Sequence, residues 1–264
     1  MENQINHNKS SCKLQYKKCG LYQIKHYHFA LVDSTNQWAK ENIDQWQAEG
    51  LTLVTASAQS RGRGRLNRAW FSPKGKNLYA TFCLFLLRPE EAGQIGQLLA
   101  LSAAQMLQKF TLPAALKWPN DLLVEQKKIA GVLCETRFLK EKQGLLCGIG
   151  LNVNMDQEEA GCIDQKATSM AIELKEKCSL ELICNQLSKQ FCSNLQLFFQ
   201  AGFTPFLSSL QSAFIHRPGQ IVEIGQGEKK IKGQFIQVNE KGALELKLFS
   251  GEVKPFYSGE LMEG

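Results

Sequence analysis

The sequence has no long apolar segment and no paired cysteine motif. Its longest apolar run, LYATFCLFLL at residues 78–87, is about half as long as a helix that spans a bilayer, and it predicts a buried strand. The first twenty residues are polar and contain no arginine, which argues against both a signal peptide and a transit peptide. The nine cysteines never occur with C-x-x-C spacing, so neither a zinc site nor a disulfide framework is indicated, and a reducing cytoplasm is favoured.

The two common nucleotide-binding loops are missing as well. The segment KGKN at residues 74–77 lacks both the upstream glycine and the hydroxyl residue of a G-x-x-x-x-G-K-[ST] loop. The segments GRGRLN and GIGLNV break the G-x-G-x-x-G pattern, because they end in Asn67 and Val153. A nucleotide would therefore have to be bound by a different arrangement of residues.

The composition is that of an ordinary globular protein, with 44% hydrophobic and 21% charged residues in a chain of 264. The 31 basic residues exceed the 25 acidic ones by six, and the resulting pI of about 8.8 suits anionic ligands or an acidic partner. This pI stays below the value of about 9 that is typical of dedicated nucleic-acid-binding domains.

Hydrophobic periodicity predicts an α+β protein with an all-β appendage. Residues 1–20 are interpreted as a flexible extension, residues 21–215 as the main domain, and residues 216–264 as a small β-barrel. Ser34 and Gln37 are spaced as a capping box that opens a helix, and Gly50 is expected to end that helix. His26 and His28 are interpreted as the surface of a strand. The predicted strands cover residues 22–33, 51–59, 78–87, 115–124, 127–138 and 144–154, the predicted helices cover 90–110, 179–200 and 203–214, and four short strands follow within 220–259.

The segment SAQSRGRGRLNRAWFSPKG, at residues 57–75, alternates arginines with glycines. Glycines let backbone N–H groups approach a ligand, and guanidinium groups donate forked hydrogen bonds to phosphate or carboxylate. A solvated loop, a nucleic-acid arm and a loop that closes over an anion all remain open for such a segment. The continuation AWFSPKGKNLY leads directly into the buried strand, which anchors the loop and argues against an arm.

Three further segments carry polar groups. Each of these groups can either bind a ligand or have only a local structural role. LKWPND, at residues 116–121, places Asn120 and Asp121 behind a proline, where both side chains can also form Asx-turns. Lys128 opens the strand KKIAGV, a position that is usually exposed to solvent. GIGLNVN contains Asn152 beside two glycines and is otherwise typical of a strand with a close backbone contact.

The order of these motifs along the chain is more specific than any one of them. The series DSTNQ, QSRGRGRLNRAWFSP, LKWPNDLLV, KKIAGVLCE, GIGLNVN and GALELK resembles that of the biotin–protein ligases, also called biotin–[acetyl-CoA-carboxylase] ligases, from about Tyr22 to Glu260. The resemblance implies a mixed sheet with helices, similar to the catalytic domain of class II synthetases, followed by an SH3-like β-barrel. It also implies that biotin is activated with ATP and Mg²⁺ as biotinyl-5′-adenylate and is then transferred to a lysine of a biotin carboxyl carrier protein.

The resemblance assigns roles to individual residues. Lys128, Arg65 and Arg68 are the expected catalytic residues, and no protein-held metal site is expected, so that Mg²⁺ arrives with ATP. The expected biotin-binding residues are Ser34, Thr35, Asn36, Gln59, Arg63, Gly64, Arg65, Lys128 and Gly131. The expected nucleotide-binding residues are Arg68, Trp70, Asn120, Asp121 and Asn152.

Two departures from the family pattern bear on function. The roughly twenty polar residues before the first predicted strand leave no room for the helix-turn-helix domain of some family members, so a monofunctional enzyme without specific nucleic-acid or membrane binding is expected, as a monomer or homodimer. The ending SGELMEG has no basic residue after Glu260, where some relatives place an arginine near the nucleotide. The alternatives are a lipoate–protein ligase, which shares the architecture, and a nucleic-acid-binding module that uses the arginine loop.

Overall fold

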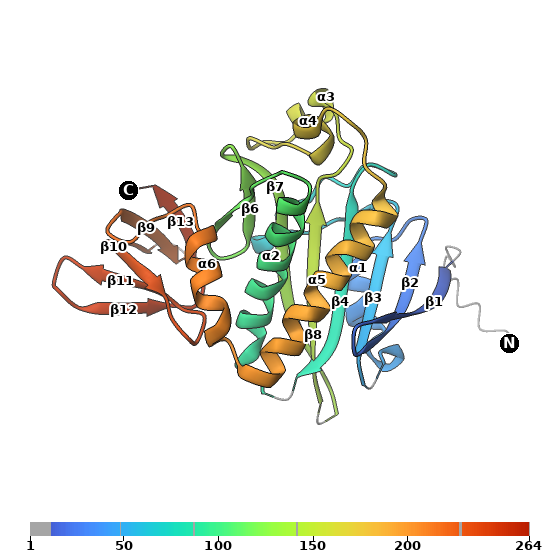
Figure 1. Ribbon diagram of the computed structural model, residues 1–264, viewed down its shortest axis with the longest axis horizontal. Helices are drawn as coiled ribbons and strands as arrows, with labels where there is room; N and C mark the ends of the chain where they lie inside the picture. The colour runs from blue at the N-terminus through green and yellow to red at the C-terminus, as the bar shows by residue number, and fades with distance from the viewer. Residues whose placement is uncertain (1–11, 48, 87, 141, 227–228, 264) are drawn as a thin grey trace, which may run out of the picture.

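The computed structural model describes residues 12–47, 49–86, 88–140, 142–226 and 229–263, which form two sheets (Figure 1). The larger sheet has eight strands in the order β1-β2-β3-β4-β8-β7-β6-β5. All its neighbouring strands are antiparallel except β2 and β3, which run parallel. Its strands are β1 (Cys12–Cys19), β2 (Tyr22–Phe29), β3 (Leu51–Ala56), β4 (Leu78–Leu86), β5 (Ala115–Lys117), β6 (Asp121–Val124), β7 (Lys127–Leu139) and β8 (Lys142–Leu151).

Helices cover both faces of this sheet. Two long helices, α2 (Glu91–Lys109) and α5 (Leu180–Ala201), pack on one face, and the short α1 (Thr35–Glu41) packs on the other (Figure 1). Successive side chains of β2 alternate between the two cores, because Ile24 joins the α2/α5 side and Tyr27 the α1 side. Within the described residues, no helix is long and apolar enough to cross a bilayer. The remaining helices are α3 (Gln157–Gly161), α4 (Met170–Leu174), α6 (Leu207–Ala213) and the 3₁₀ turns η1 (Ile43–Gln45), η2 (Arg65–Asn67) and η3 (Thr204–Phe206).

The C-terminal part of the chain forms a separate antiparallel sheet in the order β12-β11-β10-β9-β13. The α+β class is therefore confirmed, and the small sheet is consistent with an SH3-like domain. The sequence predicted four strands here, and the structure adds a fifth, because residues 260–263 pair with β9. The strands are β9 (Ile221–Gln226), β10 (Lys229–Val238), β11 (Leu244–Leu248), β12 (Val253–Phe256) and β13 (Glu260–Glu263).

The small sheet is fixed to the larger unit through α2. Gln97 Nε2 donates to the carbonyl of Gly242 at 2.7 Å, and Gln94 Nε2 donates to that of Glu240 at 2.7 Å. The division of the chain between residues 215 and 216 follows the change from one sheet to the other, although as a domain boundary it stays a prediction. This docking determines where β13 lies relative to the rest of the chain.

Several local predictions are wrong. Residues 12–19 of the predicted flexible extension form β1, which pairs with β2 along its whole length, whereas residues 1–11 lie outside the described part of the chain. β1 is an exposed edge strand, so it has no alternating apolar pattern that would identify it. The helix that Ser34 caps ends at Glu41 rather than near Gly50, and only half of the expected capping box forms, since the Gln37 side chain donates to Glu41.

His26 is buried rather than on the strand surface, with only 8% of its area exposed. Its Nε2 lies 2.7 Å from Thr55 Oγ1, and the neighbouring His28 Nδ1 lies 2.9 Å from the same hydroxyl. Burial, together with the nearby charges of Lys17 and His28, lowers the pKa of His26 to about 4. The folded protein therefore holds this imidazole neutral.

This depressed pKa predicts a loss of stability in mild acid. Unfolding restores the pKa of His26 to its ordinary value near 6.5, so below that pH the unfolded chain binds more protons than the folded one. Between pH 7 and pH 5 this single group should lower the free energy of unfolding by about 2 kcal/mol. Urea unfolding at both pH values should show a smaller loss for His26→Gln than for the wild type. Equal losses in the two proteins would refute the assignment.

Candidate active site

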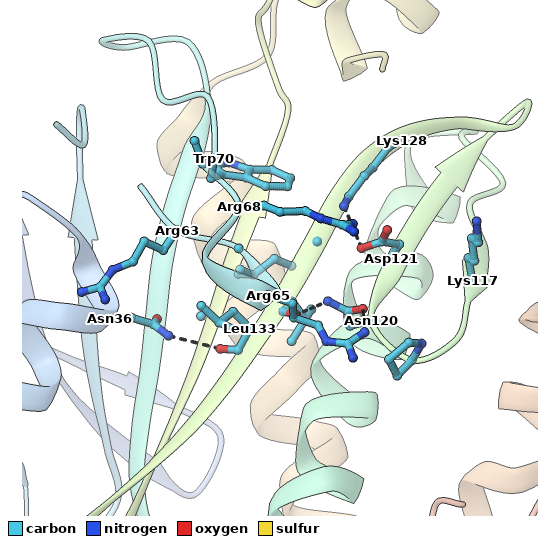
Figure 2. Close-up of a pocket in the computed structure, with 18 of the residues that line it drawn as sticks. Asn36, Arg63, Arg65, Arg68, Trp70, Lys117, Asn120, Asp121, Lys128 and Leu133 are labelled. Carbon is cyan, nitrogen blue, oxygen red and sulfur yellow. Dashed lines mark hydrogen bonds and ion pairs between the residues drawn. The ribbon is translucent and has the colours of Figure 1, made fainter. Parts of the chain in front are cut away.

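A cavity of about 230 Å³ gathers residues from both sheets (Figure 2). Its walls are the start of α1, the arginine-glycine loop, the β5–β6 turn, the first half of β7, the end of β8 and the start of β13. All of the predicted site residues line it except Asn152: Ser34, Thr35, Asn36, Gln59, Arg63, Gly64, Arg65, Arg68, Trp70, Asn120, Asp121, Lys128 and Gly131. Segments far apart in the sequence therefore meet at one place, as the motif order predicts.

One end of the cavity is lined mainly by uncharged polar groups, because the first turn of α1 faces the segment that follows β3. The Thr35 N–H donates to Gln59 Oε1 at 2.9 Å, and Gln59 Nε2 in turn donates to Ser72 Oγ at 3.1 Å. Ser34 caps the helix, and its Oγ accepts from the Gln37 N–H at 3.4 Å. These contacts fix the orientation of the Gln59 amide toward the cavity.

The orientation of the Asn36 amide is fixed as completely as that of Gln59. Asn36 Oδ1 accepts from Thr81 Oγ1 at 2.6 Å, and Nδ2 donates to the Leu133 carbonyl and to Glu135 Oε2, each at 3.2 Å. Glu135 also forms an ion pair of 2.9 Å with Lys40. Burial alone would raise the pKa of Glu135, but the hydrogen bonds from Lys40 and Asn36 outweigh it and keep the pKa below its usual value.

Glycines of β7 and β8 make room for side chains on the cavity floor. A Cβ at Gly148 would lie 2.1 Å from Asn36 Oδ1, and one at Gly150 would lie 2.3 Å from Trp70 Nε1. A Cβ at Gly131 would lie 3.1 Å from the same indole. The strands therefore need glycine at these positions because two cavity side chains lie directly on the backbone.

The arginine-glycine loop is a small hairpin that extends over the cavity. Arg63 and Ala69 face each other in an antiparallel bridge, the Trp70 N–H donates to Gly62 O at 2.9 Å, and the Gly64 N–H donates to Arg68 O at 2.8 Å. Its tip turns through a left-handed residue, Leu66, with a φ of 54°. The sequence was compatible with three functions for this loop. In the structure the loop forms part of the wall of a cavity.

The arginines of the hairpin reach different partners. Arg65 donates to Asn120 Oδ1 at 3.2 Å and to the Gly259 carbonyl at 3.0 Å, so it bridges the β5–β6 turn and the entry to β13. Burial lowers the pKa of the Arg65 guanidinium, although the nearby carboxylates of Glu260 and Asp121 oppose this change. Arg68 forms an ion pair of 2.8 Å with Glu260. Arg63 instead points toward α1, where it donates to the Gln37 side chain (Figure 2).

Lys128 stands opposite these arginines at the start of β7. Its Nζ lies 2.9 Å from Asp121 Oδ1 and 5.4 Å from the centre of the Trp70 ring, which is a cation–π distance. The side chain is mostly buried, with 16% exposed, so its charge acts in a poorly hydrated environment.

Asn152 lies behind Lys128 instead of lining the cavity. Its Nδ2 donates to the Thr168 carbonyl at 3.0 Å and to the Lys128 carbonyl at 3.4 Å, while the Lys128 N–H donates to Lys166 O at 2.8 Å. Asn152 thus holds the Lys128 backbone, and its contact with the nucleotide stays a prediction.

Sequence reasoning missed two charged residues of the cavity. Lys117 belongs to the LKWPND segment, and its register opposite Asp121 in the β5–β6 hairpin is a local signal that could have identified it. Glu260 lies in β13, and only the docking of the small sheet brings it to Arg68. Within the described residues, no group of three or more histidine, cysteine or acidic side chains is arranged to hold a metal ion.

The chain is similar to several known proteins. Residues 28–152 match the Biotin/lipoate A/B protein ligase family. The bifunctional ligase/repressor BirA of Escherichia coli is 31% identical over 237 residues, which cover 88% of this chain and 71% of the relative. The biotin–[acetyl-CoA-carboxylase] ligase of Paracoccus denitrificans is 30% identical over 229 residues, with coverages of 83% and 92%. The structure of biotin protein ligase from Aquifex aeolicus in complex with biotin and ATP has a TM-score of 0.73 and 31% identity, over 90% of this chain and 97% of that one.

The fold, the cation-lined cavity and these relatives together define a ligase that belongs to the biotin/lipoate A/B protein ligase family. Within that family the chain is one of the biotin–protein ligases, and the lipoate alternative is not favoured.

Proposed function

We propose that this protein joins biotin to ATP as biotinyl-5′-adenylate and then transfers the biotinyl group to a lysine of a biotin carboxyl carrier domain. The observation that carries the proposal is the division of one cavity into two ends. The end at Asn36 and Gln59 presents oriented neutral amides, whereas the end at Arg65 and Lys128 presents partly buried cations. Such a cavity suits a ligand with a neutral polar head and an anionic tail.

The neutral end fits the uncharged ring system of biotin. Ser34, Thr35, Asn36 and Gln59 offer hydroxyl and amide groups whose orientation is already fixed, so little conformational freedom is lost on binding. Gly131 lets the ligand approach the β7 backbone closely. Gly64 lets the ligand approach the backbone of the hairpin in the same way.

The cationic end fits the chemistry of adenylation. The biotin carboxylate attacks the α-phosphorus of ATP, the bond to the β-phosphate oxygen breaks, and pyrophosphate leaves. Both reactants are anions, so the barrier is largely electrostatic, and preorganised cations lower it. Lys128 is placed for the carboxylate and the α-phosphate, with Arg65 and Arg68 above them. Trp70, Asn120 and Asp121 surround the nucleotide.

Mg²⁺ is expected to enter this site with the phosphates of ATP. The ion prefers oxygen ligands and is usually held by one or two carboxylates together with phosphate oxygens and water. Asp121 fits this role, because its ion pair with Lys128 uses Oδ1 and leaves Oδ2 for a cation. When bound, Mg²⁺ supplies charge neutralisation for the polyphosphate.

In the second step the acceptor lysine attacks the carbonyl carbon of the adenylate. The bond from this carbon to the phosphate oxygen breaks, AMP leaves, and the amine loses a proton. The mixed anhydride hydrolyses readily, so the hairpin and Trp70 must exclude water until the carrier arrives.

The nine cysteines are all free thiols, which is in keeping with a reducing cytoplasm.

The proposal is tested by incubating the protein with MgATP, biotin and a biotin carboxyl carrier domain. Mass spectrometry should find one biotinyl group on one carrier lysine, and a carrier with arginine at that position should stay unmodified. Lipoate in place of biotin should give no product. A carrier that remains unmodified, or one that accepts lipoate equally well, would refute the proposal. A nucleic-acid module would instead show filter binding that weakens steeply with salt.

The biotin end predicts a steric effect at Gly148. In Gly148→Ala the new methyl group would displace Asn36, break its bond to Thr81 and weaken biotin binding by about tenfold, on the scale of an overpacked site. Calorimetric titration with biotin measures this change. Gly161→Ala is the matched control, since no atom lies within 4 Å of the added Cβ. Unchanged affinity in Gly148→Ala would place biotin elsewhere.

A further inference from the structure

Lys117 differs from the other cations of the cavity because its ammonium group has no partner among the described residues. Lys128 is paired with Asp121, Arg68 with Glu260, and Arg65 with Asn120 and Gly259. Arg63 donates to Gln37. No hydrogen bond or ion pair of Lys117 is found in the part of the chain that the structure describes. Among the described residues, Lys117 is therefore the one cation of the cavity whose head group is not already held by a hydrogen bond or an ion pair.

The position of Lys117 follows from the short β5–β6 hairpin. Lys117 and Asp121 are direct partners across the two antiparallel strands, so their side chains leave the same face of the sheet. Asp121 in turn reaches back to Lys128 on β7 at 2.9 Å. Figure 2 shows Lys117 on the side of Asp121 that faces away from Trp70, called the outer side below, and Lys128 on the side toward Trp70, called the inner side. The Asp121 carboxylate thus has Lys128 as its ion-pair partner and Lys117 as its cross-strand neighbour.

This arrangement matches the charges of the reacting nucleotide. If Lys128 serves the carboxylate and the α-phosphate, the β- and γ-phosphates extend outward past Asp121 and leave as pyrophosphate, which is highly charged. Arg68 already shares its charge with Glu260, whereas Lys117 breaks no contact with a described residue when it binds an anion. A flexible ammonium can also follow the leaving group as it moves away.

We propose that Lys117 binds the two terminal phosphates of ATP and the pyrophosphate leaving group, and acts only in the adenylation step. The inference rests on the proposed function, because it needs ATP as the substrate of this cavity. It assigns the outer part of the cavity to a polyphosphate and separates it from the inner part, which holds the reacting carboxylate. A solvated lysine without a role would instead be replaceable at no cost to the reaction.

The test uses Lys117→Met, which keeps the length of the side chain and removes its charge. Loss of one charge-assisted contact should raise the KM for ATP and the inhibition constant of pyrophosphate by about 10- to 100-fold. Biotin affinity, measured by calorimetry, should stay within about twofold of wild type, since Lys117 lies far from the neutral end. Lys117→Arg, which keeps the charge, should recover most of the affinity for ATP.

The second measurement separates binding of the polyphosphate from a structural effect. Chemically prepared biotinyl-5′-adenylate is added with the carrier and without ATP, and Lys117→Met should transfer biotin at the wild-type rate. Lys18→Met, an exposed lysine on strand β1 away from the cavity, is the matched control and should change neither half-reaction.

Three results would overturn the inference. They are an unchanged KM for ATP in Lys117→Met, unchanged inhibition by pyrophosphate, and an equal loss of transfer from the preformed adenylate. Failure of the proposed function has a different signature, because the wild-type protein itself would then show no biotin-dependent release of pyrophosphate.

Discussion

Lys128→Ala should reduce biotin-dependent exchange of pyrophosphate into ATP by at least about 10³-fold. The substitution removes the mostly buried cation that stands between Asp121 and Trp70 and leaves the Asp121 carboxylate unpaired beside two approaching anions. Exchange of radiolabelled pyrophosphate measures the adenylation step alone, and labelling of the carrier should fall in parallel. Both losses follow from one defect, because the carrier reaction depends on the adenylate.

Lys127→Ala is the matched control for this result. The side chain of Lys127 is partly exposed and pairs with Glu125 and Glu173, so its loss should cost at most about 1 kcal/mol of stability and leave exchange unchanged. Exchange by Lys128→Ala within about tenfold of wild type would contradict the role of Lys128 as the principal cation of the reaction.

Arg65→Gly should separate formation of the adenylate from its retention. Arg65 ties the hairpin to Asn120 and to the carbonyl of Gly259, and glycine removes both contacts while adding a flexible joint to the loop. Two hydrogen bonds of a charged group correspond to about 3 kcal/mol, so the adenylate should escape roughly 100-fold faster. Escaped adenylate acylates lysines without recognition. Serum albumin incubated with this variant, biotin and MgATP should therefore become labelled well above the wild-type level.

Arg61→Gly provides the control in the same loop, since Arg61 is exposed, does not line the cavity and should not cause leakage. Lys128→Ala should also leave albumin unlabelled, because it forms no adenylate to release. If Arg65→Gly is as inactive in pyrophosphate exchange as Lys128→Ala, the hairpin acts in the chemistry and the retention role is wrong.

The sequence predicts most of this cavity because its parts are local motifs. The cap at Ser34, the glycine-separated arginines and the strand start at Lys128 each depend on a few neighbouring residues, and their order along the chain identifies how they combine. The long helices were predicted well for the same reason, since an apolar stripe over five turns is a strong signal: the expected helix over residues 90–110 is α2 (Glu91–Lys109).

The features that the sequence did not reveal depend on contacts between distant segments. Glu260 becomes part of the cavity only because β13 pairs with β9 and the small sheet docks on α2. Asn152 is a residue type that often contacts ligands, yet its side-chain amide donates to two backbone carbonyls. β1 lacks an apolar alternation because an edge strand needs to bury little, and only its pairing with β2 defines it.

The most direct test of the account is the exchange of radiolabelled pyrophosphate into ATP by the wild-type protein, with biotin, with lipoate, and with neither acid. The account predicts exchange that depends on MgATP and biotin together, with lipoate giving no more than the acid-free background. Exchange that proceeds without biotin, that lipoate supports equally well, or that is absent under all three conditions would contradict it.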